Sequence, residues 1–244
     1  KTETIESDYQ IALDKPNIAI QGIEGSFHHI ATMKYYDENV HLIPCNRFED
    51  IFKNLDNQTA ERAVMAIENS VAGTILPNYA LLREGNYQII GEVYLRIKHQ
   101  LLTIENQKIE EITKVFSHPM ALLQCQHFFK NYPNIKLIES DDTAASAKRL
   151  AENKESGIAV MASSLAGDIF GLNTLAKNIE DNKRNFTRFL ILETNPLKNL
   201  SANKINKASI CFHLSHEVGS LASVLTLLAA SKVNLTKIQS LPLV

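Results

Sequence analysis

The chain has 244 residues, of which 45% are hydrophobic and 21% are charged. This composition is sufficient for one or two ordinary cores, and it excludes collagen-like and disordered chains. Lysine and arginine together number 25 and aspartate and glutamate 27, which gives a formal net charge of -2. Because the chain has no excess of positive charge, we expect no nucleic acid partner.

Short apolar runs alternate with amphipathic stretches from about residue 17 onward, a pattern typical of an α/β fold. The predicted strands cover 17–21, 40–43, 63–67, 87–95, 99–103, 114–116, 136–138, 157–161 and 187–192. Apolar residues at i, i+3 and i+4 spacing predict helices over 27–36, around 48–55 and over 122–129. Helices of this kind cover the faces of a sheet.

The alternation breaks between Tyr87 and Thr103, where two predicted strands follow each other without a helix. We interpret this break as a crossover between two lobes, with 187–192 returning toward the first lobe. Lobe 1 is then expected at about 17–92 plus 189–194, and lobe 2 at about 93–188. A cleft between the lobes, outside the carboxyl ends of the strands, is the expected ligand site.

The end of the chain differs in composition from the rest. Residues 195–207 are rich in Asn, Lys and Ser, which predicts a linker. Beyond it we expect a strand over 209–213, a helix over 221–230 and a second strand over 233–241. Two strands and one helix cannot bury their own apolar faces, so we expect 208–244 to be an incomplete domain or to need a partner.

The cysteines and the apolar runs indicate the compartment. Cys45, Cys125 and Cys211 are far apart and never in CxxC spacing, which argues against a disulfide framework and a structural zinc site. The apolar runs are shorter than the ~18 residues that a membrane-spanning helix needs. We therefore expect a soluble cytoplasmic protein without a membrane partner.

Several predicted strands end in a loop of small polar residues that starts a helix. Helix N-termini carry unpaired N–H groups and a partial positive charge, so a ring of them favours a small acid, especially a carboxylate. Taken singly, Ser26, Ser70, Thr143 and Ser163 are more simply explained as N-caps. Their joint occurrence at one edge of the sheet favours an acidic ligand.

Three further places carry groups suited to catalysis. His118 is either a satisfied structural histidine or an acid at a strand end. Glu68 follows a buried strand, where burial would make it an acid or a cation would keep it ionised, and the sequence leaves both possibilities open. Strand alternation sends Thr187 and Phe189 to one face and Arg188 to the other. HExxH, GxGxxG, GxSxG and GK[ST] motifs are absent, so we expect neither a metal nor a cofactor.

The order and spacing of these segments resemble prephenate dehydratase from Asn17 to Pro242. The matching segments are IAIQGIEGSFHHIATMKYY, AVMAIENSVAGTI, IIGEVYLRIKHQLL, VFSHPMALLQCQHFF, DDTAASAKRLAE, IAVMASSLAGDIFGLNTLAKNIEDNKRNFTRFLIL, HEVGSLASVL and NLTKIQSLP. The resemblance implies an α/β catalytic region over 17–194, two-lobed like a periplasmic binding protein, with a cleft between the lobes. It also implies that 208–244 is an incomplete ferredoxin-like βαββαβ ACT regulatory domain.

The resemblance implies a lyase that converts prephenate to phenylpyruvate, water and CO2 in phenylalanine biosynthesis, under allosteric regulation by L-phenylalanine. It implies that Thr187 carries the essential hydroxyl, and we take His118 and Glu68 as candidates for the proton source. The implied substrate-binding residues are Ser26, Asn69, Ser70, Ser117, Thr143, Ala144, Arg188 and Phe189. The implied phenylalanine-binding residues are Gly219, Ser220, Leu221, Asn234 and Leu235.

Two alternatives share the same architecture. An arogenate dehydratase would use the same machinery on a closely related substrate. A two-lobed module that binds a small anion without chemistry would also place anion-holding loops around a cleft. The unfinished tail predicts a homodimer or a homotetramer in either case.

Overall fold

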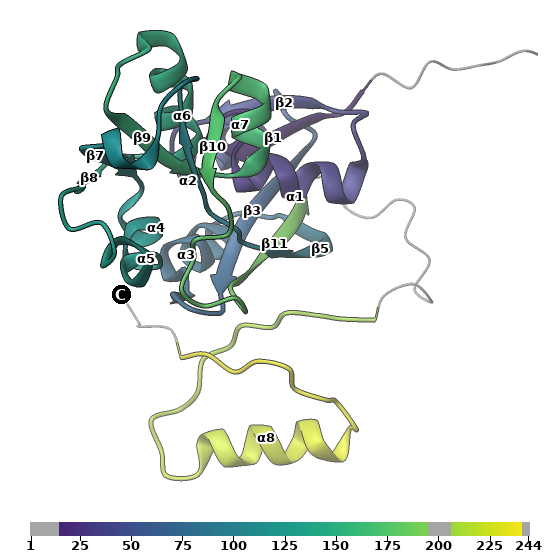
Figure 1. The fold of residues 1–244 in the computed structure, drawn as a ribbon. Coiled ribbons are helices and arrows are strands. Elements are labelled where there is room, and N and C mark those ends of the chain that lie inside the picture. The colour runs from purple at the N-terminus through teal and green to yellow at the C-terminus, as the bar shows by residue number, and fades with distance from the viewer. Residues whose placement is uncertain (1–14, 195–205, 241–244) are drawn as a thin grey trace, which may run out of the picture. The chain divides into compact units, whose positions relative to one another are not determined.

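The computed structural model describes residues 15–194 and 206–240. The chain divides into two compact units, Lys1–Pro196 and Leu197–Val244, and each is described by itself. The first unit contains two β-sheets with helices packed on them (Figure 1). This arrangement confirms the predicted two-lobed α/β architecture.

The first sheet lies in lobe 1. In the described residues it comprises β1 (Asn17–Gln21), β2 (His41–Cys45), β3 (Arg62–Asn69), β4 (Gly73–Thr74), β5 (Gln88–Arg96) and β11 (Phe186–Glu193). The order is β2-β1-β3-β11-β5, and β4 pairs with β3. β11 runs antiparallel to both β3 and β5 and joins a sheet built from a much earlier part of the chain (Figure 1).

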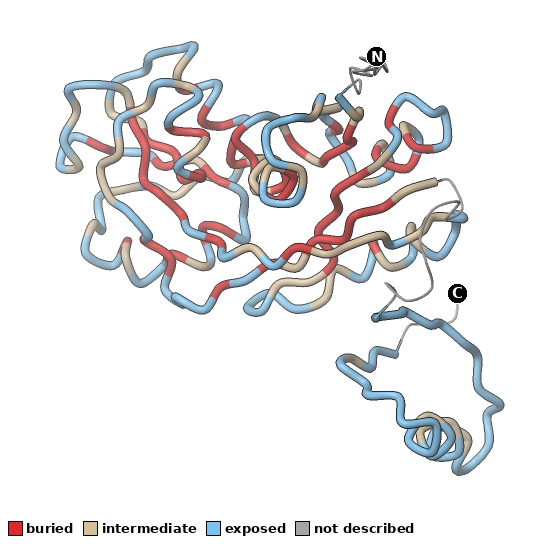
Figure 2. The backbone as a smooth tube through the Cα atoms, turned by 90° about the vertical axis from the view of Figure 1, so that its right-hand side faces the viewer, coloured by how far each residue is buried: buried red, intermediate tan, exposed pale blue. Residues whose placement is uncertain are grey.

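The second sheet lies in lobe 2. It comprises β6 (Gln100–Thr103), β7 (Lys114–Ser117), β8 (Lys136–Glu139), β9 (Ile158–Ala162) and β10 (Asn173–Ala176), in the order β10-β6-β9-β7-β8. β7 is parallel to β8 and β9, whereas β6 is antiparallel to β9 and β10. The middle strands β3 and β9 are buried over most of their length, and the buried stretches of the chain are red in Figure 2.

Helices cover both faces of each sheet. They are α1 (Phe27–Tyr36), α2 (Phe48–Asp56), α3 (Leu76–Glu84), α4 (Pro119–Leu123), α5 (Gln126–Phe129), α6 (Thr143–Asn153) and α7 (Ser164–Phe170), with a 3-10 turn at Ile109–Glu111. In lobe 1, α2 and α3 pack on the face that carries Met65 and Leu190, and α1 packs on the face that carries Val64 and Phe189. In lobe 2, α4 and α5 cover one face, and α6 and α7 cover the other.

The predicted strands of this unit are confirmed to within a few residues, and so is the helix over 27–36. The predicted helix over 122–129 is divided into α4 and α5. The short strands β4 and β10 were not predicted, because β4 has only two residues and the pairing of β10 with β6 shifts register between Thr174 and Ala176. No bounds were predicted for α3, α6 and α7. The lobe boundaries also need correction, because β5 and β11 lie wholly in the first sheet and the crossovers therefore follow Arg96 and precede Phe186.

In its described residues, 206–240, the second unit differs from the first in having no buried residue. Its helix α8 (Ser220–Ala230) confirms the predicted helix. The predicted strand over 209–213 is wrong, and residues 233–240 also form no strand, while 241 lies outside the described residues. A strand needs hydrogen bonds from a neighbouring strand, and no described segment of this unit supplies them. Ile210 and Leu227 stay 65% and 67% exposed.

These residues therefore do not show the ferredoxin-like ACT arrangement. The predicted linker over 195–207 falls almost wholly outside the described residues. Among the described helices, none combines the length and the apolar character that crossing a membrane requires.

Candidate active site

A register shift at the end of β3 brings Asn69 beside Thr187. On β3, Met65 and Ile67 both pack into the core under α2. Regular alternation would send Asn69 to that same face. Phe189 pairs with Ala66 and Arg188 with Glu68, so Ile67 has no partner on β11. As a result Asn69 lies directly opposite Thr187. Bulges of this kind commonly re-aim a side chain near a functional site.

Two buried side chains hold the backbone of β3 at this shift. The ring of His28 on α1 accepts a hydrogen bond at Nε2 from the Ala66 backbone N–H at 3.2 Å. Asn78 on α3 donates from Nδ2 to the Ala66 carbonyl oxygen at 2.7 Å. β1 pairs with β3 only as far as Val64, so these side chains serve a part of the strand that β1 does not reach. Burial lowers the pKa of His28 to about 3, which keeps its ring neutral and able to accept.

A chain of side-chain hydrogen bonds begins at Thr187, which is 8% exposed. Asn69 donates from Nδ2 to Thr187 Oγ1 at 2.9 Å and to Asn185 Oδ1 at 2.7 Å. Asn185 donates from Nδ2 to Gln124 Oε1 at 2.8 Å, and His99 Nε2 lies 3.3 Å from the same oxygen. The chain therefore joins the first sheet to the end of α4 and to the crossover between the lobes.

The loop before α1 packs against lobe 2. Gly25 has a φ of +84°, and a Cβ built on it would lie 2.8 Å from the Ala166 Cα, so a larger residue would not fit. Ser163 donates from Oγ to the Gly25 carbonyl at 2.6 Å and caps α7. A Cβ on Gly22 would lie 3.1 Å from Asp142 Oδ2, which places the start of α6 beside this loop as well.

His118 and Asp142 lie at two helix starts in lobe 2. His118 caps α4 by accepting the Met120 N–H at Nδ1, at 3.2 Å. Since Nδ1 accepts, the neutral ring carries its proton on Nε2, and the residue is exposed. Asp142 caps α6 by accepting the Ala145 N–H at 2.8 Å. Burial raises the pKa of Asp142, while its hydrogen bonds and the nearby His118 act in the opposite direction.

The predicted residues Arg188 and Glu68 lie on the face of the sheet opposite to Thr187. Arg188 binds Glu92 Oε2 through Nε at 2.8 Å and Nη2 at 2.7 Å, and its Nη1 lies 3.5 Å from Glu68 Oε1. The cation that the sequence analysis considered for Glu68 is thus Arg188. Phe189 is 1% exposed and packs edge-on against His28 in the core.

Several predicted hydroxyl groups are already engaged within the protein. Ser26 caps α1 by accepting the His29 N–H at 3.2 Å. Ser70 donates to the Arg184 carbonyl and accepts from the Phe186 N–H, which fixes the start of β11 next to Thr187. Ser117 is fully buried and donates to the Met161 carbonyl. The helix cap before Thr143 is Asp142, and Thr143 and Ala144 begin α6 as buried residues.

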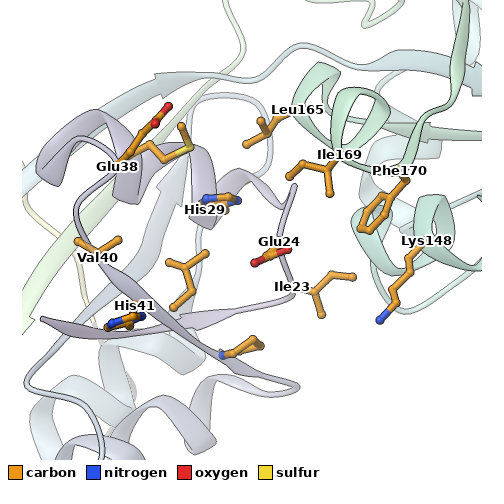
Figure 3. Close-up of a pocket in the computed structure, with 13 residues that line it drawn as sticks. Ile23, Glu24, His29, Glu38, Val40, His41, Lys148, Leu165, Ile169 and Phe170 are labelled. Atoms are coloured by element: carbon orange, nitrogen blue, oxygen red, sulfur yellow. The ribbon is translucent and has the colours of Figure 1, made fainter. Parts of the chain in front are cut away.

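A cavity of about 650 Å³ lies between α1 and β2 of lobe 1 and α6 and α7 of lobe 2. Glu24 and His29 line it from lobe 1, and Lys148 and Phe170 line it from lobe 2 (Figure 3). None of the predicted site residues lines this cavity. Within residues 15–194 and 206–240, no cluster of three or more His, Cys, Asp or Glu side chains is arranged to hold a metal ion.

The predicted phenylalanine-binding residues belong to the second unit. Gly219 precedes α8 with a φ of +88°, a left-handed conformation that suits glycine. The remaining residues of this set are Ser220 and Leu221 at the start of the helix, and Asn234 and Leu235 after its end.

The comparison with protein families decides the identity of the fold and its site. The model of the family described as prephenate dehydratase matches residues 18–197, which is the whole region of the two sheets. The chain belongs to the prephenate dehydratase family. The resemblance inferred from the sequence is thereby confirmed for this region, whereas the match does not extend over the C-terminal unit.

Individual members of the prephenate dehydratase family give the same result. The arogenate dehydratase/prephenate dehydratase 2 of Arabidopsis thaliana is 39% identical over 226 residues, which are 93% of this chain and 58% of the relative. A bifunctional chorismate mutase/prephenate dehydratase of Buchnera aphidicola is 33% identical over 231 residues, 93% of this chain and 60% of the relative. The chain thus spans about three fifths of the length of these curated relatives.

A solved structure shares the fold. The prephenate dehydratase of Arthrobacter aurescens in complex with L-Phe superposes with a TM-score of 0.78 at 24% identity, covering 93% of this chain and 76% of that one. At this identity the likeness concerns the fold of the prephenate dehydratase family.

Four residues that the structure brings to this site were not predicted from the sequence. Asn185 stands two residues before Thr187 in the segment NFTRF, and its position alone could have suggested a role. Asp142 directly precedes the predicted Thr143. His99 and Gln124 gave no comparable signal, because their contact joins a crossover to a helix end and depends on the packing of the two lobes.

Proposed function

We propose that this protein converts prephenate to phenylpyruvate, water and CO2. The observation that carries the proposal is the state of the Thr187 hydroxyl. Its oxygen accepts from Asn69, and in the described part of the chain no group accepts its proton. A buried hydroxyl held in this way is available to donate to a bound ligand.

The reaction requires the protein mainly to hold the substrate and a hydrogen-bond donor in the right positions. Prephenate carries two carboxylates and a ring hydroxyl. As the carboxylate on the ring leaves as CO2, its bonding electrons enter the ring, and the C–O bond to the hydroxyl breaks at the opposite carbon. One proton converts the departing hydroxide to water. Because the ring becomes aromatic, a donor in place and an oriented substrate supply much of the catalysis.

The roles follow from the donors present. Thr187 donates a hydrogen bond to the leaving hydroxyl, and since a free threonine is a very weak acid, another group provides the proton. His118 at its exposed position is our candidate for that source, and because only a doubly protonated imidazole is acidic enough, the ring would release the Met120 N–H, take up a second proton at Nδ1 and donate from Nε2. Glu68 is a weaker candidate because it is paired with Arg188 on the opposite face of the sheet.

Helix starts account for binding of the carboxylates. α1 and α6 begin near one another, since a Cβ on Gly22 would lie 3.1 Å from both Ser26 Cβ and Asp142 Oδ2, and the N–H groups at their starts, with the partial positive charge of each helix, form the proposed carboxylate site. The start of α4 adds no free donor, because Pro119 has no N–H and His118 already accepts from Met120 and Ala121. Ser70 and Ser117 support this region through backbone contacts. Arg188 and Phe189 hold β11 in place rather than touching substrate.

Arogenate is the second candidate substrate, and it differs from prephenate by an amino group in place of the keto group on the side chain. The relative from Arabidopsis thaliana is named for both substrates. The two substrates are therefore compared directly in the test.

The test is to incubate the protein separately with prephenate and arogenate and to follow phenylpyruvate and phenylalanine. Formation of phenylpyruvate at catalytic protein concentrations supports the proposal. Formation of phenylalanine alone assigns an arogenate dehydratase. If both substrates bind but persist unchanged, the protein is a binding module without chemistry.

We also propose that L-phenylalanine binds the C-terminal unit at Gly219, Ser220, Leu221, Asn234 and Leu235, in a cytoplasmic homodimer or homotetramer. The exposed apolar side chains of this unit support association with a second copy. Millimolar phenylalanine should raise the melting temperature and lower the rate, and light scattering should give a mass above that of one chain.

A further inference from the structure

The chain of amides from Thr187 to His99 has a fixed direction. Asn69 Oδ1 accepts two backbone hydrogen bonds, from Val71 N–H at 2.9 Å and Ala72 N–H at 2.8 Å. These bonds fix the orientation of the Asn69 amide, because a rotated amide would set its own N–H groups against those donors. The donors of Asn69 must therefore point toward Thr187 and Asn185.

The orientation of each further amide follows from that of the amide before it. Since Asn69 donates to Asn185, the atom it meets is the oxygen, and Asn185 turns its Nδ2 toward Gln124. Gln124 accordingly presents its oxygen both to Asn185 and to His99. If the neutral ring of His99 carried its proton on Nδ1, the lone pair on Nε2 would face the Gln124 oxygen and the two would repel. The proton of His99 must therefore be on Nε2.

We propose that His99 is a positioning residue for the reaction, whose Nε2–H holds the Gln124 amide and, through Asn185 and Asn69, keeps the Thr187 hydroxyl directed as a donor. This role rests on the proposed dehydratase function. His99 does not touch the reacting atoms. From the far end of the amide chain it stabilises the same direction that the Val71 and Ala72 N–H groups set at Asn69, and this direction leaves the proton of Thr187 free for the substrate.

The surroundings of His99 favour a fixed ring. The residue is 3% exposed, its ring meets Phe27 edge-on with 5.4 Å between centroids, and its backbone N–H donates to the buried Glu180 Oε2 at 3.1 Å. Phe27 is the first residue of α1 in lobe 1, whereas Gln124 ends α4 in lobe 2. His99 therefore lies where both lobes meet the crossover, and the ring has contacts with each.

The first measurement concerns the tautomer and needs no activity. Long-range ¹H–¹⁵N NMR of the full protein labelled with ¹⁵N-histidine distinguishes a proton on Nε2 from one on Nδ1, and a His99 variant assigns the signal. We expect the Nε2–H form. An Nδ1–H form at neutral pH would overturn the proposal whatever the protein catalyses.

The second measurement compares two variants of equal side-chain length. His99→Gln can still donate to Gln124, whereas His99→Met cannot. We expect His99→Met to lose about tenfold in kcat with KM changed by less than about threefold, and His99→Gln to recover most of this loss. The exposed His127→Met is the matched control and should retain full activity.

The outcomes separate this proposal from the proposed function. If wild-type protein has no dehydratase activity, the proposed function fails, while the NMR result still tests the direction of the chain. If wild-type is active and folded His99→Met keeps its kcat, or folded His99→Gln loses as much as His99→Met, the positioning role is overturned.

Discussion

The two faces of strand β11 hold the protein together by different means. One face carries Thr187, linked to Asn69 and Asn185 by hydrogen bonds between neutral groups. The other carries Arg188, bound to Glu92 and close to Glu68. Neighbouring residues of one strand are thus placed in an uncharged network and in an ion-pair cluster.

The difference teaches what each kind of contact can specify. Coulombic attraction falls off gradually and depends little on direction, so the cluster on the Arg188 face can hold β3, β5 and β11 together over small shifts. A hydrogen bond weakens steeply when its angle is poor, and an amide has distinct donor and acceptor ends. The Thr187 face can therefore define which way a hydroxyl points, whereas the Arg188 face secures where the strand lies.

Removing the hydroxyl should have the largest effect. Thr187→Val keeps the shape and the β-branched side chain that suits a strand but can donate nothing. We expect kcat for prephenate to fall by about a thousandfold or more, with a nearly unchanged melting temperature. Thr187→Ser is the control and should stay within about tenfold of wild type. A Val variant with more than a tenth of wild-type activity would contradict the assignment of Thr187.

Replacing the Asn69 amide by a carboxylate should have the next largest effect. Asn69→Asp preserves the acceptors for Val71 N–H and Ala72 N–H but removes the donors to Thr187 and Asn185. The Thr187 hydroxyl would then donate to the new carboxylate, and the added charge would repel an anionic substrate. We expect about a hundredfold loss in kcat/KM, measured with prephenate at neutral pH.

The control for this variant carries the same change at an exposed position. Asn131→Asp adds one negative charge on the surface near the end of α5 and should leave kcat/KM unchanged. Equal activity of the two variants would mean that the direction of the amide chain has no role in the reaction.

The sequence predicted the strands and the two lobes because hydrophobic periodicity reports burial on a sheet. It failed at β4, which has only two residues, at β10, whose pairing with β6 shifts register between Thr174 and Ala176, and in the C-terminal unit. There the alternation at 209–213 is present, but no neighbouring strand among the described residues completes the hydrogen bonds. The hydrophobic pattern of a segment shows that it is suited to a strand, but hydrogen bonding to a neighbouring strand decides whether the strand forms.

The site was predictable only in part for a related reason. The alternation from Thr187 to Arg188 correctly predicted opposite faces. The position of Asn69 opposite Thr187 depends on a one-residue shift in β3, and the partners of that shift, His28 and Asn78, come from two different helices. Contacts of this kind arise from tertiary packing, which no spacing along the chain encodes.

Breaking the ionic face should affect stability more than activity. Arg188→Met removes the cation that lies between Glu68 and Glu92. We expect the free energy of unfolding to drop by about 2 kcal/mol, because the attraction of a partly buried ion pair is lost while the two carboxylates still repel each other. kcat should fall by less than about tenfold. Urea denaturation and steady-state rates measure the two quantities.

A more exposed pair on the same sheet provides the comparison. Arg62 binds Glu193 at 3.0 Å with 35% of its side chain exposed, against 11% for Arg188. Arg62→Met should therefore cost less stability than Arg188→Met. A thousandfold loss of activity in folded Arg188→Met would instead place Arg188 on the substrate and would remove the contrast between the faces.

The smallest expected effect is that of pH on stability through His28, which binds the backbone of β3 next to the register shift. Burial lowers the pKa of His28 to about 3 from the ordinary 6.5. Between these values the unfolded chain takes up a proton that the folded protein does not, so stability is fully present above pH 6.5 and declines as the pH falls. The decline due to this residue amounts to about 1.4 kcal/mol for each pH unit.

His28→Gln tests this slope, since glutamine can accept from the Ala66 N–H through its oxygen and does not titrate. Burial also lowers the pKa of His99, so both proteins lose stability in acid, and the difference between them isolates His28. We expect the free energy of unfolding, measured by urea denaturation, to fall less steeply between pH 6 and 5 for the variant. The difference in slope should correspond to the uptake of about one proton. Parallel declines would mean that the folded protein also protonates His28, in which case the ring could not accept from Ala66 and another contact would have to hold Asn69 opposite Thr187.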